Sequence, residues 1–350
     1  MRNSTVLVTG NLGYIGPILG KYLKKKYPYM KLIGLDNAYF QANLLSPNIS
    51  YDHYYDTQFY GDLRYFDFRI LPPVDYIISL GAISNDPMGN IFEAVTYDIN
   101  FKSTINLAKF AKNHGVKRFI FASSCSVYGA GGADSKNEYS PLNPLTPYAK
   151  SKIMSEEFLE KLSDTSFNVT CLRFATACGA SPRLRLDLVL NDFVSSSLLF
   201  NKIEILSDGT PWRPLININD MCKAVEWSLI RDSEILNFLS INIGSNDWNF
   251  QIKDLAYSVK NILNNQTQVS INSEAQPDKR SYKVDFTLFE KLAPQFTPTE
   301  SLESTIRDIT SSLVNSGFNN KNFRDSHLIR LKSLENLRVN EMIDKSLVWS

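Results

Sequence analysis

The sequence contains few of the residues that bind metals or form disulfide bridges. Its 350 residues include only three histidines and four cysteines. No CxxC spacing occurs among the cysteines, which are Cys125, Cys171, Cys178 and Cys222, so neither a zinc site nor a disulfide framework is expected. We therefore predict a protein without a bound metal, whose cysteines are reduced thiols.

The sequence also lacks an excess of charge of either sign. There are 37 Lys and Arg residues against 36 Asp and Glu residues, which gives a net charge of +1. No basic field would hold nucleic acid or an anionic membrane, and this favours a small-molecule partner. No apolar run reaches the ~18–20 residues of a membrane span, and the chain enters a strand-like segment without a signal-peptide core, so a cytoplasmic location is expected.

The first half of the chain alternates between short apolar runs and longer segments of helical period. Strands are predicted near 6–8, 32–35, 74–80, 118–122 and 167–172, and helices over 13–26, 92–113 and 147–162. Such alternation is typical of βαβ units, which build a parallel sheet with helices on both faces and ligands at the carboxyl ends of its strands. The predicted fold class is therefore α/β, with a doubly wound parallel sheet.

After about residue 173 this alternation gives way to loops rich in Pro, Arg, Asp and Asn. Helices are predicted near 187–200, 220–230, 252–263 and 302–314. This part of the chain indicates a smaller, mixed α/β cap. The last stretch, 319–350, is polar with scattered leucines, and we expect a docking helix there rather than a disordered tail.

A glycine-rich segment follows the first predicted strand. Gly10, Gly13 and Gly16 are spaced three residues apart, between a strand and a helix. Glycine lets a pyrophosphate approach the backbone closely, and the helix N-terminus offers unpaired N–H groups to the anion. Asp36 follows Gly16 by twenty residues, at the end of the second strand, where a carboxylate accepts the hydroxyls of an adenine ribose. This carboxylate would repel a 2′-phosphate, so NAD is predicted in preference to NADP.

A second pattern combines hydroxyls at a strand end with a tyrosine and a lysine. Ser123 and Ser124 end the strand near 118–122, and Tyr148 and Lys152 have the i,i+4 spacing that brings two side chains to one face of a helix. An unperturbed tyrosine has a pKa of about 10, so a neighbouring ammonium, joined by an oxidised nicotinamide, must favour the phenolate. Lys152 can supply that charge, which makes Tyr148 the candidate acid/base.

Together these motifs resemble the extended short-chain dehydrogenase/reductase superfamily and, within it, the NAD-dependent nucleotide-sugar epimerase/dehydratase family. The resemblance spans about Thr5 to Asp308 and is carried by Thr9-Gly10-x-x-Gly13-Tyr14-Ile15-Gly16, Gly61-Asp62-Leu63-Arg64, Leu80-Gly81-Ala82, Asn100, Ser123-Ser124-x-x-Val127-Tyr128-Gly129, Tyr148-x-x-x-Lys152 and Leu172-Arg173-Phe174. It implies a Rossmann-type NAD-binding domain over 1–174, to which about 214–245 return, a substrate cap over 175–318 and a helical extension over 319–350. It also implies a homodimer paired through the helices near 92–113 and 147–162.

The resemblance assigns roles residue by residue. Ser124, Tyr148 and Lys152 would be catalytic. The residues implied in NAD binding are Gly10, Gly13, Tyr14, Ile15, Gly16, Asp36, Asn37, Asp62, Leu63, Leu80, Gly81, Ala82, Asn100, Ser123, Tyr148 and Lys152. The residues implied in binding a nucleotide-diphosphate sugar are Ser84, Ser124, Cys125, Ser126, Thr176, Arg183, Arg185, Asn191, Arg213 and Arg280. Arginine forks match phosphate geometry, and which of Arg183 and Arg185 faces the ligand stays open.

The residues that follow Ser124 limit the reaction. Members of this family that are 4,6-dehydratases carry an Asp-Glu pair there, and decarboxylating members carry a Glu, whereas this chain has Cys125 and Ser126. Members that epimerise C3 or C5 use a Cys with a His from the cap, and no His lies between His114 and His327. Cys125 is either catalytic or a small packed residue at the strand end, and the second interpretation is favoured.

Two routes then remain, epimerisation at C4 and simple 4-oxidation or 4-keto reduction. Both need only the three catalytic side chains and NAD. Epimerisation is favoured because net keto reduction more often uses NADPH, whereas self-regenerating NAD suits a reaction without net redox change. A 4,6-dehydratase and a non-catalytic nucleotide-binding protein are lesser alternatives. The second is disfavoured because the fold alone does not require Ser124, Tyr148 and Lys152, and the chain has all three. The sequence identifies neither the nucleotide nor the sugar.

Overall fold

A computed structural model of the chain describes residue 1 and residues 3–46, 52–132, 134–232, 236–275, 278 and 280–350. Its centre is a seven-stranded parallel sheet with the order β10-β6-β5-β4-β1-β2-β3. The strands are β1 (Thr5–Thr9), β2 (Lys31–Asp36), β3 (Thr57–Tyr60), β4 (Tyr76–Ser79), β5 (Arg118–Ser124), β6 (Asn168–Phe174) and β10 (Phe238–Ile243). The predicted α/β class with a doubly wound parallel sheet is confirmed.

Apolar runs form these strands because both faces of the sheet are covered. Val6 and Val8 pack into one core on one face of β1, and Leu7 packs into another core on the opposite face. This alternation follows from the two-residue period of a strand. The strand order reverses between β1 and β4, so a crevice opens at the carboxyl ends of these two strands, where such sheets bind ligands.

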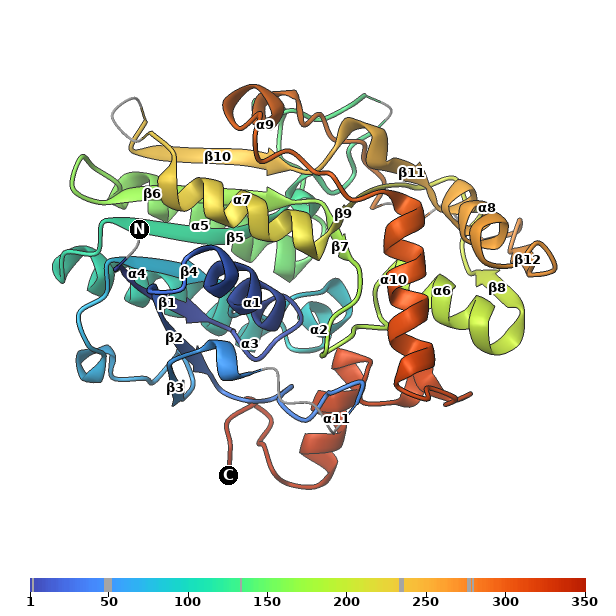
Figure 1. Cartoon of the computed structure of the whole chain (residues 1–350), viewed down its shortest axis with the longest axis horizontal. Helices are drawn as coiled ribbons and strands as arrows, with labels where there is room; N and C mark the ends of the chain where they lie inside the picture. The colour runs from blue at the N-terminus through green and yellow to red at the C-terminus, as the bar shows by residue number, and fades with distance from the viewer. Residues whose placement is uncertain (2, 47–51, 133, 233–235, 276–277, 279) are drawn as a thin grey trace.

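Helices cover the two faces of the sheet and build the rest of the molecule. They are α1 (Gly16–Lys26), α2 (Asp86–Ile91), α3 (Glu93–Tyr97), α4 (Ser103–Asn113), α5 (Pro147–Leu162), α6 (Val189–Phe200), α7 (Ile218–Ile230), α8 (Ile252–Leu263), α9 (Thr287–Leu292), α10 (Leu302–Asn315) and α11 (Arg330–Val339). Helices α1 and α7 lie together on one face of the sheet (Figure 1), while α4 and α5 pack on the other. No helix within the described ranges has the length and apolarity that crossing a membrane requires.

The helix predicted over 92–113 is interrupted in the structure. It consists of α3, a π-helical turn over Asp98–Lys102, and α4. Periodicity alone cannot show a single π turn, because the apolar spacing on either side of it stays helical. The homodimer expected through α4 and α5 stays a prediction.

A smaller part of the molecule lies beyond the carboxyl ends of the parallel strands, at the right of Figure 1. Its strands form a three-stranded sheet of β11 (Asn249–Gln251), β9 (Trp212–Asn217) and β7 (Thr176–Cys178), and a pair of β12 (Gln268–Ile271) with β8 (Lys202–Ile205). The chain returns to the main sheet through α7 and β10. These short strands and β3 were not predicted, because runs of three to six residues carry little periodic signal.

A buried ion pair joins α5 to three neighbouring strands. Glu156 of α5 accepts three hydrogen bonds from the guanidinium of Arg173 on β6, at 3.2, 3.0 and 2.7 Å, and one from Ser240 Oγ on β10, at 2.7 Å. It also accepts a hydrogen bond from Ser123 Oγ, on β5. Glu156 and Arg173 are 4% and 6% exposed, so neither charge has solvent to replace its partner.

Replacing Glu156 by Gln is expected to lower the free energy of unfolding by about 3–5 kcal/mol, because the Arg173 charge is left buried without a counter-charge. Urea unfolding followed by circular dichroism measures this change. Glu157, the next residue on α5, is exposed, and Glu157→Gln should change stability by about 0.5 kcal/mol or less. Equal effects of the two substitutions would show that the pair does not stabilise the fold.

Candidate active site

Two adjoining cavities open at the carboxyl ends of the parallel strands. The first, which we call the glycine-loop cavity, is lined mainly by the end of β2, by the loops that follow β1, β2, β3 and β4, and by four residues from later segments. Its lining residues are Gly10, Gly13, Tyr14, Ile15, Leu35, Asp36, Asn37, Tyr39, Phe40, Gly61, Asp62, Leu63, Leu80, Gly81, Ala82, Ile83, Ser84, Ile99, Ala177, Arg185 and Arg330. The second, which we call the tyrosine cavity, is lined by Tyr148, Lys152 and residues of the smaller part. The two share Ile15, Leu80, Ala82, Ser84, Ala177 and Arg185.

The glycines of the β1–α1 loop leave room for a ligand to approach the backbone. Gly10 has a φ of +71°, and a Cβ there would lie 2.6 Å from the backbone of Gly81. A Cβ at Gly16 would lie 1.9 Å from the carbonyl oxygen of Asn11, so Gly16 lets α1 pack under the loop, although it does not line the cavity. Helix α1 begins at Gly16, directly after Gly13, Tyr14 and Ile15, which line the cavity, so the positive end of the helix lies beside it.

Asp36 ends β2 beside this loop. Its carboxylate accepts hydrogen bonds from the N–H of Leu12, at 3.0 Å, and from the N–H of Ala38, at 2.8 Å. Burial raises the pKa of Asp36, and these two backbone hydrogen bonds oppose that shift. Asn37, Asp62 and Leu63 line the cavity beside it, so the structure brings the residues expected at an adenosine together.

Ser124, Tyr148 and Lys152 lie together on the wall of the tyrosine cavity. Ser124 ends β5, and its Oγ accepts a hydrogen bond from the N–H of Ser126 at 3.1 Å. Tyr148 and Lys152 lie one turn apart on α5, and the Lys152 Nζ is 5.7 Å from the centroid of the Tyr148 ring. Lys152 Nζ also donates to the carbonyl oxygen of Ala122 at 2.6 Å. Ser123, Ser126, Ser84 and Thr176 line the same cavity, as expected.

Desolvation sets the charge state of this group. It raises the pKa of Tyr148 to about 12, the hydrogen bond from Ser124 and the charge of Arg185 act in the opposite direction, and Asp86 reinforces the rise. Burial lowers the pKa of Lys152 to about 8, against the influence of Glu156 one turn further along α5. Tyr148 is therefore protonated at neutral pH with the protein's own residues alone, and additional positive charge is needed before it can act as a base.

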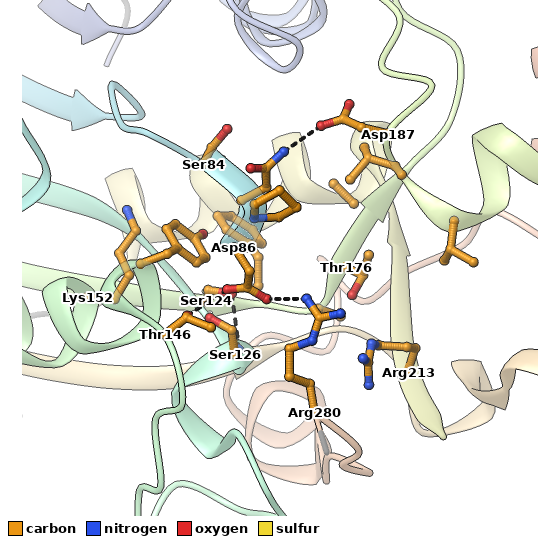
Figure 2. A pocket seen from close by; sticks show the side chains of 18 of the residues that line it. Ser84, Asp86, Ser124, Ser126, Thr146, Lys152, Thr176, Asp187, Arg213 and Arg280 are labelled. Carbon is orange, nitrogen blue, oxygen red and sulfur yellow. Dashed lines mark hydrogen bonds and ion pairs between the residues drawn. The ribbon is translucent and has the colours of Figure 1, made fainter. Parts of the chain in front are cut away.

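Three arginines line the tyrosine cavity, each paired with an aspartate. Arg185 binds Asp187 at 2.7 Å, Arg213 binds Asp278 at 2.9 Å, and Arg280 binds both Asp278, at 2.7 Å, and Asp86, at 2.9 Å. In Figure 2 the guanidinium of Arg280 points at Asp86, and Ser124 and Ser126 lie on the same side of the cavity. All three arginines were predicted from the sequence as substrate-binding residues; they line one cavity, and their role in binding a diphosphate stays a prediction.

Sequence reasoning missed the aspartates and several other cavity residues. Asp86 lies in Asn85-Asp86-Pro87, a segment that signals only the start of a helix, and Asn85 does cap α2. Asp187 and Asp278 are each two residues from an arginine that was predicted, and this spacing was the available signal. The other missed residues include Tyr282, which lines the tyrosine cavity, and Tyr39, Phe40 and Arg330, which line the glycine-loop cavity.

Two residues expected at the substrate lie elsewhere. Cys125 is 1% exposed, its thiol donates to the carbonyl oxygen of Arg173 at 3.1 Å, and burial raises its pKa well above the usual range. Arg183 is also 1% exposed, and its Nε donates to the carbonyl oxygen of Gln41 at 3.2 Å. Neither lines the two cavities described above, so Arg185 is the arginine of this pair that lines them. Cys125 begins the 3-10 turn Cys125–Tyr128 after β5, where its side chain packs in the hydrophobic core, and Arg183 is directed at the backbone of Gln41.

Asn191 and Asn100 act on the site through other groups rather than lining it. Asn191 donates to the carbonyl oxygen of Arg185, at 2.9 Å, and to the hydroxyl of Tyr14, at 3.1 Å. Asn100 exchanges two hydrogen bonds with the backbone of Ile83, at 2.8 and 3.0 Å. Both amides are buried and satisfied, so they hold the cavity walls in place rather than offering a ligand a free donor.

The four cysteines of the chain are all buried, and this gives a direct test of the position of Cys125. We expect an aromatic disulfide reagent at pH 8 to leave all four thiols of the folded protein unreacted on mixing and to modify all four after unfolding in guanidinium. Absorbance at 412 nm follows the reaction. Fast modification of Cys125, identified by peptide mass spectrometry, would show that its thiol reaches the cavity.

The chain is similar to known proteins over much of its length. Residues 6–244 match the model of the NAD dependent epimerase/dehydratase family. A putative UDP-glucose 4-epimerase of Methanocaldococcus jannaschii is 28% identical over 242 residues, which are 66% of this chain and 75% of that protein. A dTDP-D-glucose 4,6-dehydratase of Dictyostelium discoideum is 27% identical over 275 residues, which are 73% of this chain and 62% of that protein.

The fold has a close counterpart among solved structures. The UDP-N-acetylglucosamine 4-epimerase from Methanobrevibacter ruminantium M1, in complex with UDP-N-acetylmuramic acid, shares it with a TM-score of 0.77, at 23% identity, over 90% of this chain and 99% of that one. The family match contains the glycine loop, Asp36, Ser124, Tyr148 and Lys152 within a single span of more than half of the chain. This chain therefore belongs to the NAD-dependent epimerase/dehydratase family of enzymes.

Proposed function

We propose that this chain interconverts the C4 epimers of a nucleotide-diphosphate sugar, with NAD as cofactor and a 4-keto sugar as intermediate. The tyrosine cavity is the observation that carries the proposal. Its wall presents a hydroxyl, a phenol and an ammonium together, and each carboxyl group that lines it within the described residues is paired with an arginine. The cavity thus supplies an acid/base for a hydroxyl proton and no free carboxylic acid for the elimination of water.

The glycine-loop cavity fits a dinucleotide. Its backbone at Gly10 and Gly13 carries no side chain that would keep a pyrophosphate away, and α1 begins beside it. Asp36 and Asp62 would bind the adenosine half, and Leu80, Gly81 and Ala82 lead from there to the tyrosine cavity. Bound NAD would supply a positively charged nicotinamide ring that reversibly accepts a hydride.

The three paired arginines suit the diphosphate of the substrate. A guanidinium held by an aspartate keeps its charge while buried, and a diphosphate that enters the cavity offers stronger, bidentate acceptors. Ser126 Oγ is buried on the wall without a hydrogen-bond partner among the described residues, and Ser84 and Thr176 lie across the same space. These hydroxyls are suited to sugar hydroxyls, because a donor left without a partner in a folded protein is costly.

Tyr148 moves the proton in this scheme. Its oxygen accepts a hydrogen bond from Ser124, which favours the phenolate, and Lys152 lies one helical turn away. Tyr148 would take the proton of the C4 hydroxyl as hydride leaves C4, and return it when hydride is added to the other face of the ketone. Because Tyr148 keeps its proton without further positive charge, the base forms only when cofactor is present, which limits unproductive proton transfer.

Incubation with a panel of UDP-, GDP-, CDP- and dTDP-sugars tests the proposal. We expect one sugar to yield its C4 epimer, seen by proton NMR, without net change in absorbance at 340 nm, because the hydride is returned. Accumulation of NADH would identify a dehydrogenase instead. Loss of water with a 4-keto product would identify a dehydratase, and silence across the panel with NAD bound would support a binding protein.

Tyr148→Phe serves as the matched variant, since it removes only the phenolic oxygen. Turnover should fall by about 10²–10⁴-fold, the usual contribution of a positioned acid/base, while the affinity for NAD stays the same. Stopped assays and fluorescence titration measure these two quantities. Activity that survives the substitution undiminished contradicts the role of Tyr148.

A further inference from the structure

The C-terminal extension, residues 319–350, packs against the glycine-loop cavity. It lies outside the span of the family match, which ends at residue 244. Tyr39 Oη donates to the carbonyl oxygen of Leu347, and Trp349 Nε1 donates to the carbonyl oxygen of Asn37 at 2.6 Å. Tyr39 and Asn37 both line the cavity. In Figure 1, α11 and the C-terminus lie below the sheet, on the side of its β2–β3 edge.

Arg330, the first residue of α11, contributes a guanidinium to the wall of this cavity. The side chain is 2% exposed. Its Nη2 donates to the carbonyl oxygen of Arg183 at 3.0 Å, and the guanidinium lies 4.6 Å from the centroid of the Phe40 ring. Its Nη1 has no hydrogen-bond partner in the part of the chain that the structure describes. A charged donor that is buried and unpaired is destabilising, which suggests a partner from outside the protein.

Buried charges of both signs surround Arg330. Arg185 and Arg183 add positive charge beside it, and Asp187 and Asp36 add negative charge. Burial, followed by the charge of Arg185, lowers the pKa of Arg330 to about 9. An anion in the cavity would stabilise the buried guanidinium charge of Arg330, and Gly10 and Gly13 of the glycine loop line the same space.

We propose that Arg330 donates from Nη1 to a phosphate of the bound dinucleotide, so that the C-terminal extension forms part of the cofactor site. The inference rests on the NAD site of the proposed function. The pyrophosphate would then be held between the N-terminus of α1 and Arg330. Since the extension is anchored on Asn37 and Tyr39, cofactor binding and docking of the extension stabilise each other.

Binding measurements on the full chain test this role without depending on activity. Arg330→Met keeps an unbranched apolar side chain beside Phe40 and removes the guanidinium with its donors. We expect it to weaken ADP-ribose about 10- to 100-fold, the loss typical of a charged hydrogen bond, and to leave adenosine, which has no phosphate, nearly unchanged. Calorimetric titration and competition against NAD give both affinities. Arg338→Met on the exposed side of the same helix, with its guanidinium 5.5 Å from the Phe92 ring, should change neither.

Other outcomes overturn the proposal. Equal losses for adenosine and ADP-ribose would mean that Arg330 only holds the extension in place, and an unchanged ADP-ribose affinity would exclude the contact. A loss confined to NADP would place Arg330 at a 2′-phosphate instead. If Arg330→Met does not fold, Arg330→Lys replaces it, with a smaller loss expected for ADP-ribose alone. Failure of the unmodified chain to bind NAD at all would refute the cofactor site itself rather than the role of Arg330.

Discussion

The ion pair between Glu156 and Arg173 is the contact on which the arrangement of the catalytic wall depends. Glu156 lies one helical turn after Lys152 on α5, and it binds side chains from β5, β6 and β10 together. Water cannot solvate the buried carboxylate or guanidinium if the pair separates. A shift of α5 along the sheet would therefore leave both charges buried and unpaired. The positions of Tyr148 and Lys152 relative to the end of β5 follow from this one attachment. Arg173 extends it further, since its Nη1 donates to Tyr128 at 3.2 Å, just after the hydroxyl-bearing strand end.

The same principle, that buried charges are paired, accounts for the electrostatics of the cavities. Arg185, Arg213 and Arg280 are each held by aspartates, so the smaller part can present positive charge to a diphosphate without leaving it bare. Tyr148 keeps its proton despite the charge of Arg185, so in the proposed function its activation depends on the positive charge of bound cofactor. Arg330 is the exception among these charges, because one of its nitrogens has no partner in the described part of the chain. A buried donor without a partner, such as Arg330 Nη1, indicates a ligand more directly than an arginine that is already paired with an aspartate.

Much of the cofactor lobe could be predicted because its signals are local. The glycine spacing lies within one loop, Asp36 ends one strand, and Tyr148 and Lys152 lie one turn apart on one helix. The structure places these residues on the two cavities, except Gly16, which packs beneath the loop. The predictions that failed depended on the direction in which a side chain points in the folded protein. Cys125 lies between Ser124 and Ser126, and Arg183 lies two residues before Arg185, all three of which line a cavity. Both side chains are nevertheless buried away from the cavities, and no pattern of neighbours predicts that direction. The role of Arg330 was invisible for a related reason, since almost 300 residues separate it from Asp36 and only folding brings them near.

The central claim is that hydrogen leaves C4 of the sugar and returns to C4 with its electrons. A nucleotide-diphosphate sugar labelled with deuterium at C4 tests this claim most directly, with the product examined by mass spectrometry and NMR. The account predicts a C4 epimer that retains its deuterium in ordinary water, because the hydride never exchanges with solvent. A C4 epimer that carries hydrogen from the solvent at C4 would contradict it, since epimerisation would then proceed by removal of a proton rather than a hydride.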